Sequence, residues 1–356
     1  MATDLKKIGK VLATCRQAAP VYGRSTLAIL LRVARLRLVE RFSPKEAFLW
    51  GLANPGLPAR EIASYTSRSQ LYRLQARHNP KSLAFLTEDK AFFYGYCQGV
   101  GISVPQLYGV YHRLGGHSAR GPLLRERADW RRFFLEEVPE SFVVKPSKGV
   151  YARGLRVLTR HGHLLSDQQG EKLSVDQLLD QLDADKAYDT WVVQQRVENH
   201  PRLAELSATR SVQTARTVTF VGLDRKPRVL FACFKVVASD HASDNFDYGQ
   251  SGNLLGNIDL DKGTLEKVVG KAKSGIGLDG HSYHPRTGIA LDGFVLPHWA
   301  ALVRQAEEAA LKFWPLRTIG WDIAIGPDGP IILEGNVWWD ALHNTHRLMP
   351  RYQHLV

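Results

Sequence analysis

The sequence predicts a mixed α/β protein of the α+β type, with a helical N-terminal region followed by two α+β subdomains. Three observations support this fold class. Apolar residues recur at helical spacing over the first 80 or so residues. From Ser141 onward, short apolar strands alternate with helical segments. The chain also has 356 residues, which exceeds the size at which one hydrophobic core stops growing.

The N-terminal region, residues 1–85, is expected to consist of helices interrupted at prolines, at Pro20, Ser43-Pro44 and residues 54–58. Ser43 followed by Pro44 is a helix-start pattern, because the hydroxyl can cap the helix and proline is tolerated in the first turn. A pre-core segment, residues 86–140, is expected to hold a helix over 88–99 capped by Thr87. A strand over 104–111 and an irregular basic linker over 115–132 complete this segment.

Residues 25–42 have leucines and arginines at helical spacing. A basic amphipathic helix of this kind can lie on an anionic membrane surface, or it can pack on the protein with its basic face in solvent. We favour packing through a stripe formed by Leu27, Leu30, Leu31, Ala34 and Leu38. Membrane contact is therefore possible but not favoured.

Net charge, cysteine content and the lengths of apolar runs argue against several classes of protein. The formal net charge is +12, yet no zinc-finger or RNP-type module accompanies it, so no nucleic-acid partner is predicted. The three cysteines are widely spaced and suggest no disulfide framework. No run approaches 18 apolar residues, and no signal-peptide pattern opens the chain. These features predict a reduced, cytoplasmic protein.

From Ser141 onward, the sequence pattern is typical of βαβ units. A first subdomain, residues 141–200, should contain a strand over 141–146, a glycine-bearing loop over 147–154, a helix over 173–184 and a strand over 190–197. A C-terminal subdomain, residues 201–356, should carry strands near 213–221 and 227–238. A helix over 297–313 and a final hairpin should follow.

That hairpin is the most informative stretch of the chain. Two apolar runs, 319–325 and 331–336, flank a Pro-Asp-Gly turn. Strand side chains alternate between faces, so Glu334 and Asn336 point the same way, and Asp322 on the partner strand can reach that face. Two carboxylates and an amide oxygen suit Mg²⁺ when phosphates complete its coordination shell. The alternative is the polar face of an ordinary hairpin.

Lys145 ends an apolar strand just before the loop 147–154. Backbone N–H groups of such a loop can cradle phosphate oxygens while the ammonium group neutralises their charge. The loop is neither a Walker loop nor a Rossmann fingerprint, because Gly149 and Gly154 join two strands. Glycine hairpins are common, so a purely structural role is the alternative.

The order of these parts resembles the ATP-grasp superfamily over roughly residues 85–345. Further segments look like its sugar-transfer-associated, α-L-glutamate-ligase-like branch. These segments are Thr214-Ala215-Arg216-Thr217-Val218-Thr219, Gly252-Asn253-Leu254, His284-Pro285-Arg286-Thr287-Gly288 and Ile319-Gly320-Trp321-Asp322.

The resemblance implies an ATP-binding enzyme that uses Mg²⁺, for which Mn²⁺ can substitute. It assigns Lys90 and Lys145 to the ATP phosphates and the loop 147–154 to a lid over them. The implied nucleotide contacts are Lys90, Lys145, Ser147, Gly149, Gly154, Gln194, Gln195, Val197, Asn199 and His200, with the last two near the ribose. The implied metal ligands are Asp322, Glu334 and Asn336. Relatives often have an acidic residue at the crossover where this chain has glutamine, so adenine contact would rest on the backbone.

For the chemistry, the resemblance points to Arg216, Lys235 and Asn253 as catalytic residues. A guanidinium fork can bind a phosphoryl group and a carboxylate together, whereas a solvated strand face is the alternative for Arg216. The implied substrate residues are His284, Arg286, Trp338, His343 and His346. Two pairs of histidines stand three residues apart, His281 with His284 and His343 with His346. Zinc binding is not favoured for them, because no matching Cys or acidic pair is evident.

A carboxylate becomes reactive toward an amine once it carries a phosphoryl group. The sequence therefore predicts an ATP- and Mg²⁺-dependent carboxylate–amine ligase that acts through an acyl phosphate. A phosphotransferase of the same fold and a non-catalytic ATP-binding module are the alternatives. The expected partners are a small-molecule carboxylate and amine, and the sequence leaves the oligomeric state open.

Overall fold

The computed structural model describes residues 2–149, 153–240 and 243–340. The centre of the predicted lid, residues 150–152, and the predicted substrate residues His343 and His346 lie outside the described residues. The α-helices are α1 (Ala2–Tyr22), α2 (Thr26–Leu38), α3 (Pro44–Leu49), α4 (Ala59–Ile62), α5 (Arg68–His78), α6 (Phe85–Glu88), α7 (Lys90–Gly99), α8 (Arg127–Arg132), α9 (Val175–Ala184), α10 (Pro201–Ser207) and α11 (Trp299–Lys312). Shorter helical turns are η1 (Lys81–Leu83), η2 (Phe133–Glu137) and η3 (Asp247–Gly249).

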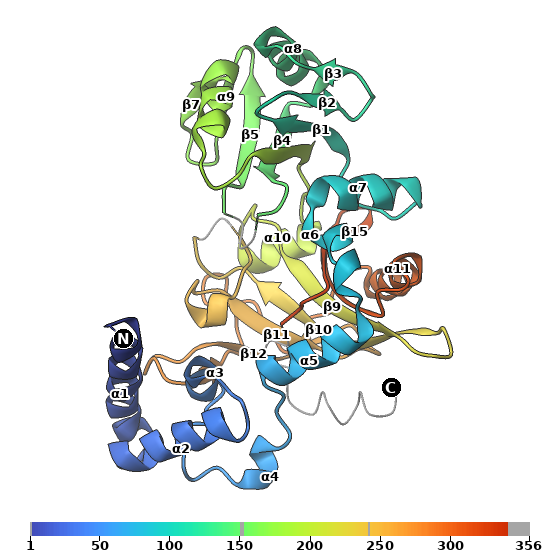
Figure 1. Ribbon diagram of the computed structural model, residues 1–356. Helices are drawn as coiled ribbons and strands as arrows, with labels where there is room; N and C mark the ends of the chain where they lie inside the picture. Colours follow the sequence, from blue (N-terminus) through green and yellow to red (C-terminus); the bar gives the residue numbers. More distant parts are fainter. Residues whose placement is uncertain (1, 150–152, 241–242, 341–356) are drawn as a thin grey trace.

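The helices α1 to α4 lie at one end of the molecule, and α5 lies against the second sheet (Figure 1). Ser43 caps α3 as predicted, and its hydroxyl accepts the N–H of Glu46 while Glu46 accepts the N–H of Ser43. Two predictions for this region were wrong. Helix α1 continues through Pro20 to Tyr22. Thr87 lies inside α6, and it is the Asp89 carboxylate that caps α7.

Helix α2 packs on the body, but not through the predicted stripe. The structure buries Ile29, Val33 and Leu36, which face a small core with residues of α1 and α3. Leu27, Leu31 and Leu38 are instead 65, 63 and 80 % exposed. Two apolar faces overlap on this helix, and tertiary contacts select the one that is buried.

The next part of the chain builds an antiparallel sheet with the order β3-β2-β1-β8-β4-β5-β6-β7. Its strands are β1 (Leu107–His112), β2 (Gly116–Ser118), β3 (Leu123–Leu124), β4 (Ser141–Pro146), β5 (Arg156–His161), β6 (Leu164–Ser166), β7 (Lys172–Ser174) and β8 (Thr190–Gln195). The predicted linker over 115–132 is therefore wrong in part, because it contains β2, β3 and α8. β2 and β3 have only three and two residues and pair with each other and with β1 inside residues 107–124. Each is too short to show an alternating strand pattern in the sequence.

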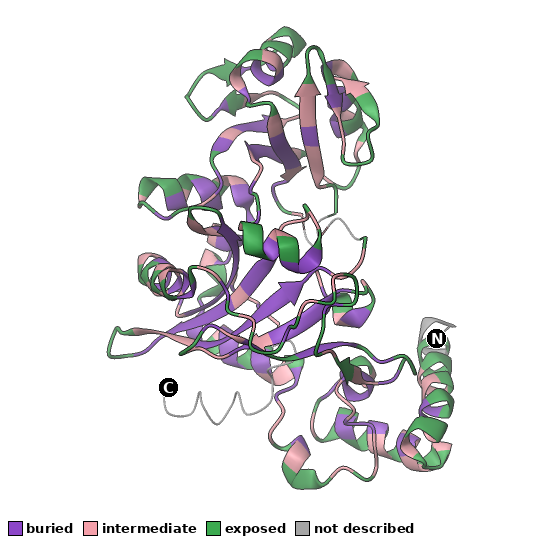
Figure 2. Cartoon of the chain, turned by 180° about the vertical axis from the view of Figure 1, so that it is seen from behind, coloured by how far each residue is buried: buried purple, intermediate pink, exposed green. Residues whose placement is uncertain are grey.

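A second sheet has the order β13-β12-β11-β10-β9-β14-β15. Its strands are β9 (Thr214–Val221), β10 (Pro227–Val236), β11 (Leu254–Ile258), β12 (Leu265–Lys271), β13 (Leu278–Gly280), β14 (Thr318–Gly326) and β15 (Gly329–Asn336). Helix α11 packs against β9, β10, β14 and β15, and the central strands of the sheet are almost entirely buried (Figure 2). The predicted final hairpin is confirmed as β14 and β15.

The α+β class is confirmed, with one correction to the expected βαβ texture. Helix α9 does precede β8, but every strand pair recorded within the described ranges is antiparallel, including β4 with β8. Across these ranges we find no helix long and apolar enough to span a bilayer.

Candidate active site

A cleft of about 620 Å³ opens between the two sheets. Its walls come from β4, β5 and β8 of one sheet and from β9, β10, β14 and β15 of the other. Twelve of the predicted site residues line it, namely Lys90, Lys145, Gly149, Gln194, Gln195, Val197, Arg216, Lys235, Asp322, Glu334, Asn336 and Trp338. Residues far apart in the sequence thus converge on one cavity.

Strand register places the charged residues of the second sheet in a row. Arg216 of β9 stands directly opposite Asp322 of β14, and Asp322 in turn stands opposite Glu334 of β15. Cys233 pairs with Arg216 on the other side, so Lys235, two residues on, shares the face of Arg216. Pairing across four adjacent strands, β10, β9, β14 and β15, therefore creates a continuous charged strip on the cleft side of the sheet.

Asp322 is the centre of this strip. Arg216 donates Nε to Asp322 Oδ1 at 2.6 Å and Nη2 to Oδ2 at 2.8 Å, which is the bidentate fork geometry. Lys235 Nζ lies 3.0 Å from the same Oδ1. Burial would raise the pKa of Asp322, but the positive charges of Arg216 and Lys235 hold that pKa well below its usual range. Asp322 is therefore ionised.

The donor set beside Asp322 fits a hard cation. Asp322 Oδ1 receives Arg216 Nε and Lys235 Nζ, whereas Oδ2 receives only Arg216 Nη2 among the contacts above. The amide nitrogen of Asn336 donates to the Gly320 carbonyl at 3.4 Å, which leaves its amide oxygen available to the cleft. Glu334 is half-buried beside them. Three oxygen donors suit Mg²⁺ that takes its remaining ligands from phosphates and water.

Two lysines define the part of the cleft near the glycine loop. Lys90 is 8 % exposed and its Nζ donates to the Gly149 carbonyl at 2.9 Å, with Glu334 Oε2 at 3.8 Å. Lys145 Nζ donates to the Tyr94 hydroxyl at 2.8 Å. Burial lowers the pKa of Lys145 from 10.5 to about 7, and repulsion from Lys90 adds to that effect. Two adjacent cations in a partly dehydrated cleft make a favourable phosphate-binding environment.

Ser147 and Gly154 do not line the cleft, but both shape the part of the structure next to the glycine loop. The Ser147 hydroxyl bonds to the Asp89 carboxylate, and the Ser147 carbonyl accepts the N–H of Lys90 at 2.9 Å. Ser147 thereby fixes the start of α7 and the position of Lys90. Gly154 has φ +71°, and a Cβ there would lie 2.9 Å from Pro146 Cγ. Only glycine fits both the conformation and the close approach.

The crossover strand β8 brings Gln194, Gln195 and Val197 to the cleft wall. The Gln195 side-chain oxygen accepts the N–H of Gln106 at 3.1 Å, and the Gln195 carbonyl accepts from Gln194 Nε2 at 3.4 Å. The Gln195 side chain is thus used to fix the strand end, whereas the buried amide oxygen of Gln194 has no hydrogen-bond partner among the described residues.

Neither Asn199 nor His200, which were predicted to lie near a ribose, lines this cleft. Asn199 donates to the Ser211 carbonyl at 2.8 Å and accepts the N–H of Gln213 at 2.9 Å, so both ends of its amide hold the 211–213 segment. His200 caps α10 through Nδ1 and stacks on His298 at 5.4 Å. Both residues have structural partners that the sequence did not reveal.

Asn253 and His284 do not line the cleft either, and both side chains bond to backbone groups. Asn253 is fully buried, and its amide oxygen accepts from Ala238 and Ser239 while its nitrogen donates to the Ser243 and Asn245 carbonyls. These bonds shape the 238–245 loop that ends at the cleft. His284 Nε2 bonds to the Val237 carbonyl at 3.0 Å.

Arg286 is also absent from the cleft wall. Its guanidinium group bonds to Asp240 Oδ1 at 3.1 Å and to the Ser239 carbonyl. It therefore holds residues 239 and 240 from outside the cleft. Of the predicted substrate residues that the structure describes, Trp338 is the one that lines the cleft.

Two residues that sequence reasoning missed take part in the cleft. Tyr94 of α7 is fully buried, receives Lys145 Nζ and donates its hydroxyl to the Leu333 carbonyl at 2.8 Å. Asp244 accepts the N–H of Thr214 at 2.8 Å and lies 3.8 Å from Lys235 Nζ. Burial raises the pKa of Asp244. Neither residue sits in a recognisable motif, because each reaches the site through tertiary packing.

A family model described as sugar-transfer associated ATP-grasp matches residues 69–355 of this chain. No curated protein matches the chain in sequence. Similar solved structures include D-alanine–D-alanine ligase from Bacillus anthracis, with 12 % identity, 81 % of this chain and 74 % of that chain covered, and a TM-score of 0.42.

L-amino acid ligase from Bacillus licheniformis has 12 % identity and a TM-score of 0.39, with 72 % of this chain and 42 % of that chain covered. An N5-carboxyaminoimidazole ribonucleotide synthetase in complex with ADP has 10 % identity and a TM-score of 0.42, with 78 % and 52 % covered. This chain thus spans about half the length of those two proteins. At such values of identity and TM-score, these similarities support no conclusion about activity.

The family model, by contrast, covers most of the chain, including the whole charged strip. The chain belongs to the sugar-transfer-associated ATP-grasp family.

Proposed function

We propose that this protein is an ATP- and Mg²⁺-dependent ligase that joins a carboxylate to an amine through an acyl phosphate. The observation that carries the proposal is the charged strip in the cleft. Four basic side chains (Lys90, Lys145, Arg216 and Lys235) and three oxygen donors (Asp322, Glu334 and Asn336) line the same cavity. Cations and metal ligands in one water-poor space suit phosphoryl transfer, in which positioning and charge neutralisation do most of the work.

Each group has a distinct role in this proposal. Lys90 and Lys145 neutralise the phosphates of the nucleotide from the side of the glycine loop. Asp322, Glu334 and Asn336 would hold Mg²⁺, which supplies charge stabilisation at the transferred phosphoryl group when it is bound. Arg216, fixed by Asp322, presents its remaining N–H donors to the phosphoryl group and to the substrate carboxylate.

The proposed reaction has two steps. A substrate carboxylate oxygen attacks the γ-phosphorus, and the bond from that phosphorus to the ADP oxygen breaks. A neutral amine then attacks the acyl carbon, the carbon–oxygen bond to phosphate breaks, and the amine nitrogen loses a proton. Arg216 and Lys235 counter the negative charge that both steps concentrate near the strip.

A screen of carboxylate and amine pairs tests this proposal. ATP, Mg²⁺ and purified protein are incubated with each pair, ADP release is followed, and the condensed product is identified by mass spectrometry. The proposal predicts ADP release that requires both partners and yields an amide. A phosphorylated product formed without any amine would instead identify a phosphotransferase.

A further inference from the structure

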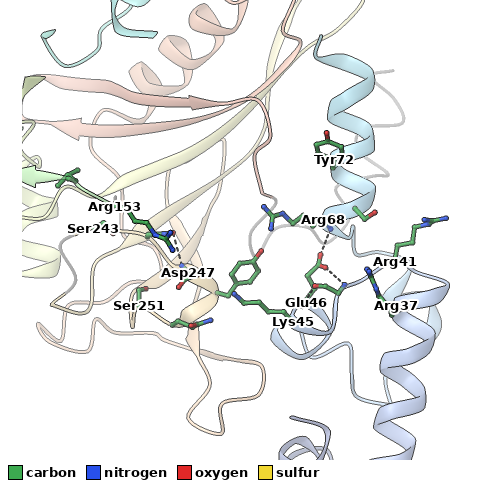
Figure 3. Close-up of a pocket in the computed structure, with 16 residues that line it drawn as sticks. Arg37, Arg41, Lys45, Glu46, Arg68, Tyr72, Arg153, Ser243, Asp247 and Ser251 are labelled. Atoms are coloured by element: carbon green, nitrogen blue, oxygen red, sulfur yellow. Dashed lines mark hydrogen bonds between the residues drawn. The ribbon is translucent and has the colours of Figure 1, made fainter. Parts of the chain in front are cut away.

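A second, larger pocket of about 1250 Å³ adjoins the cleft (Figure 3). One wall comes from the N-terminal helices and carries Arg37, Arg41 and Arg68. The other wall carries Arg153, and the loop at 243–251 completes it. Small-molecule pockets typically measure about 300–1,000 Å³, so this space exceeds what a free amino acid would need.

The pocket is strongly basic. Five cationic side chains line it (Arg37, Arg41, Lys45, Arg68 and Arg153), against two carboxylates, Glu46 and Asp247. Glu46 is 7 % exposed, and its two oxygens accept the backbone N–H groups of Ser43 and Arg68 at 2.7 Å each. The Glu46 carboxylate is thus engaged by the backbone, and the balance of charge facing the pocket stays positive.

Three of these side chains, those of Arg37, Arg41 and Arg153, make no hydrogen bond or ion pair with any residue in the described parts of the chain. All three are exposed in the pocket walls. Like charges gathered without partners repel one another, and an anionic ligand would relieve that repulsion. Arginine also forms forked hydrogen bonds with carboxylate and phosphate oxygens.

The backbone of the pocket wall is unusual as well. Arg41, Asp247 and Tyr248 have φ of +64°, +38° and +54°, the left-handed region that residues with side chains rarely adopt. Such conformations cost free energy and concentrate at ligand-binding sites. Lys45 Nζ also lies 3.7 Å from the Tyr248 ring centroid, so the two walls are held together across the pocket.

The pocket and the cleft share a boundary. Arg68, Arg153 and Ser243 line both of them. The rings of Tyr72, which lines the pocket, and Trp338, which lines the cleft, are 5.0 Å apart between centroids. A molecule whose reacting carboxylate lies near Arg216 can therefore extend past Arg68 into the basic pocket.

We propose that this pocket binds the part of the carboxylate substrate that carries further negative charge, so that the substrate is a polyanion with at least two carboxylate or phosphate groups. This inference rests on the proposed function for the reacting carboxylate. Carboxylate and phosphate groups both present anionic oxygens to the arginines, and the experiment below distinguishes between these two groups.

Isothermal titration in metal-free buffer provides the test, with tricarballylate as the polycarboxylate probe and inorganic tripolyphosphate as the polyphosphate probe. The pocket variant is Arg37→Gln/Arg41→Gln. The control is Arg35→Gln/Arg60→Gln, which removes the same charge from two exposed arginines outside the pocket. The single variants Arg37→Gln and Arg41→Gln replace the pocket variant if the double variant does not fold.

We expect wild-type protein to bind at least one probe, the pocket variant to lose about tenfold or more in affinity, and the control to stay within about twofold. The probe that binds identifies the anionic group. Absence of binding to both probes, or equal losses in pocket variant and control, would overturn the inference. A parallel titration with Mg·ADP reports separately on the proposed function, since neither Arg37 nor Arg41 lines the cleft.

Discussion

Arg216 and Asp322 stand opposite each other on β9 and β14 and are joined by two hydrogen bonds of 2.6 and 2.8 Å. Their side chains are 12 and 6 % exposed. The same carboxylate is thus the anchor of the arginine and a proposed metal ligand. This arrangement couples the position of the phosphoryl-binding arginine to the position of the metal, and it makes Asp322 important for stability as well as for chemistry.

Asp322→Asn should destabilise the protein by about 3–5 kcal/mol, because it leaves two buried cations with a weakened partner. Chemical denaturation measures the loss. Replacing the pair together, as Arg216→Met/Asp322→Leu, should cost less, since the arginine charge is removed with its partner. A smaller loss for the single variant than for the double variant would contradict this account of the pair.

Glu334→Gln should reduce Mg²⁺-dependent nucleotide affinity by about tenfold or more while leaving thermal stability nearly unchanged, because Glu334 is half-buried and contributes mainly to the metal shell. Titration of ADP with and without Mg²⁺ measures the effect. Glu266→Gln is a matched control at an exposed position of β12. Equal Mg²⁺ dependence in Glu334→Gln and in the control would remove Glu334 from the metal site.

Nucleotide affinity should fall as pH rises from about 7 to 9. Lys145 has a pKa of about 7 in the free protein, so it is largely neutral above that pH. A bound phosphate favours the charged ammonium form and raises this pKa, so binding takes up a proton in that window. Calorimetry of ADP binding at pH 8, in buffers of different ionisation enthalpy, measures the proton uptake. Zero uptake would show that Lys145 does not meet the phosphates.

Gly154→Ala should destabilise the protein by about 1–3 kcal/mol, since alanine meets both a left-handed conformation and the Pro146 ring. Gly162→Ala is the control, because Gly162 has φ +62° but open space around its Cβ position. The difference between the two variants in thermal unfolding isolates the contact with Pro146. If both variants lose the same stability, close packing of the loop on β4 is not what selects glycine at 154.

The parts of the site that depend on local pattern could be predicted from the sequence. Side-chain alternation in the two strands of one hairpin predicts that Asp322, Glu334 and Asn336 share a face. The position of Lys145 at the end of an apolar strand predicts that it lies beside the glycine loop. The α+β class followed from similar reasoning. These features need no knowledge of distant contacts.

Features decided by tertiary contacts could not be predicted. Asn253 was expected among the catalytic residues, but its amide bonds to backbone groups of Ala238 and Ser243 in an earlier segment of the chain. Tyr94 and Asp244 carry no motif and reach the cleft only because α7 and the 238–245 loop pack there. The face of α2 that is buried was also undetermined, because leucines surround more than one side of that helix.

Transfer of ¹⁸O from the substrate carboxylate tests the central claim most directly. With a carboxylate and amine pair that supports turnover, the carboxylate is labelled with ¹⁸O and the inorganic phosphate formed from ATP is analysed by mass spectrometry. An acyl phosphate requires one carboxylate oxygen to leave with the phosphate, so the account predicts one ¹⁸O in each phosphate released. Unlabelled phosphate formed alongside the amide would contradict it.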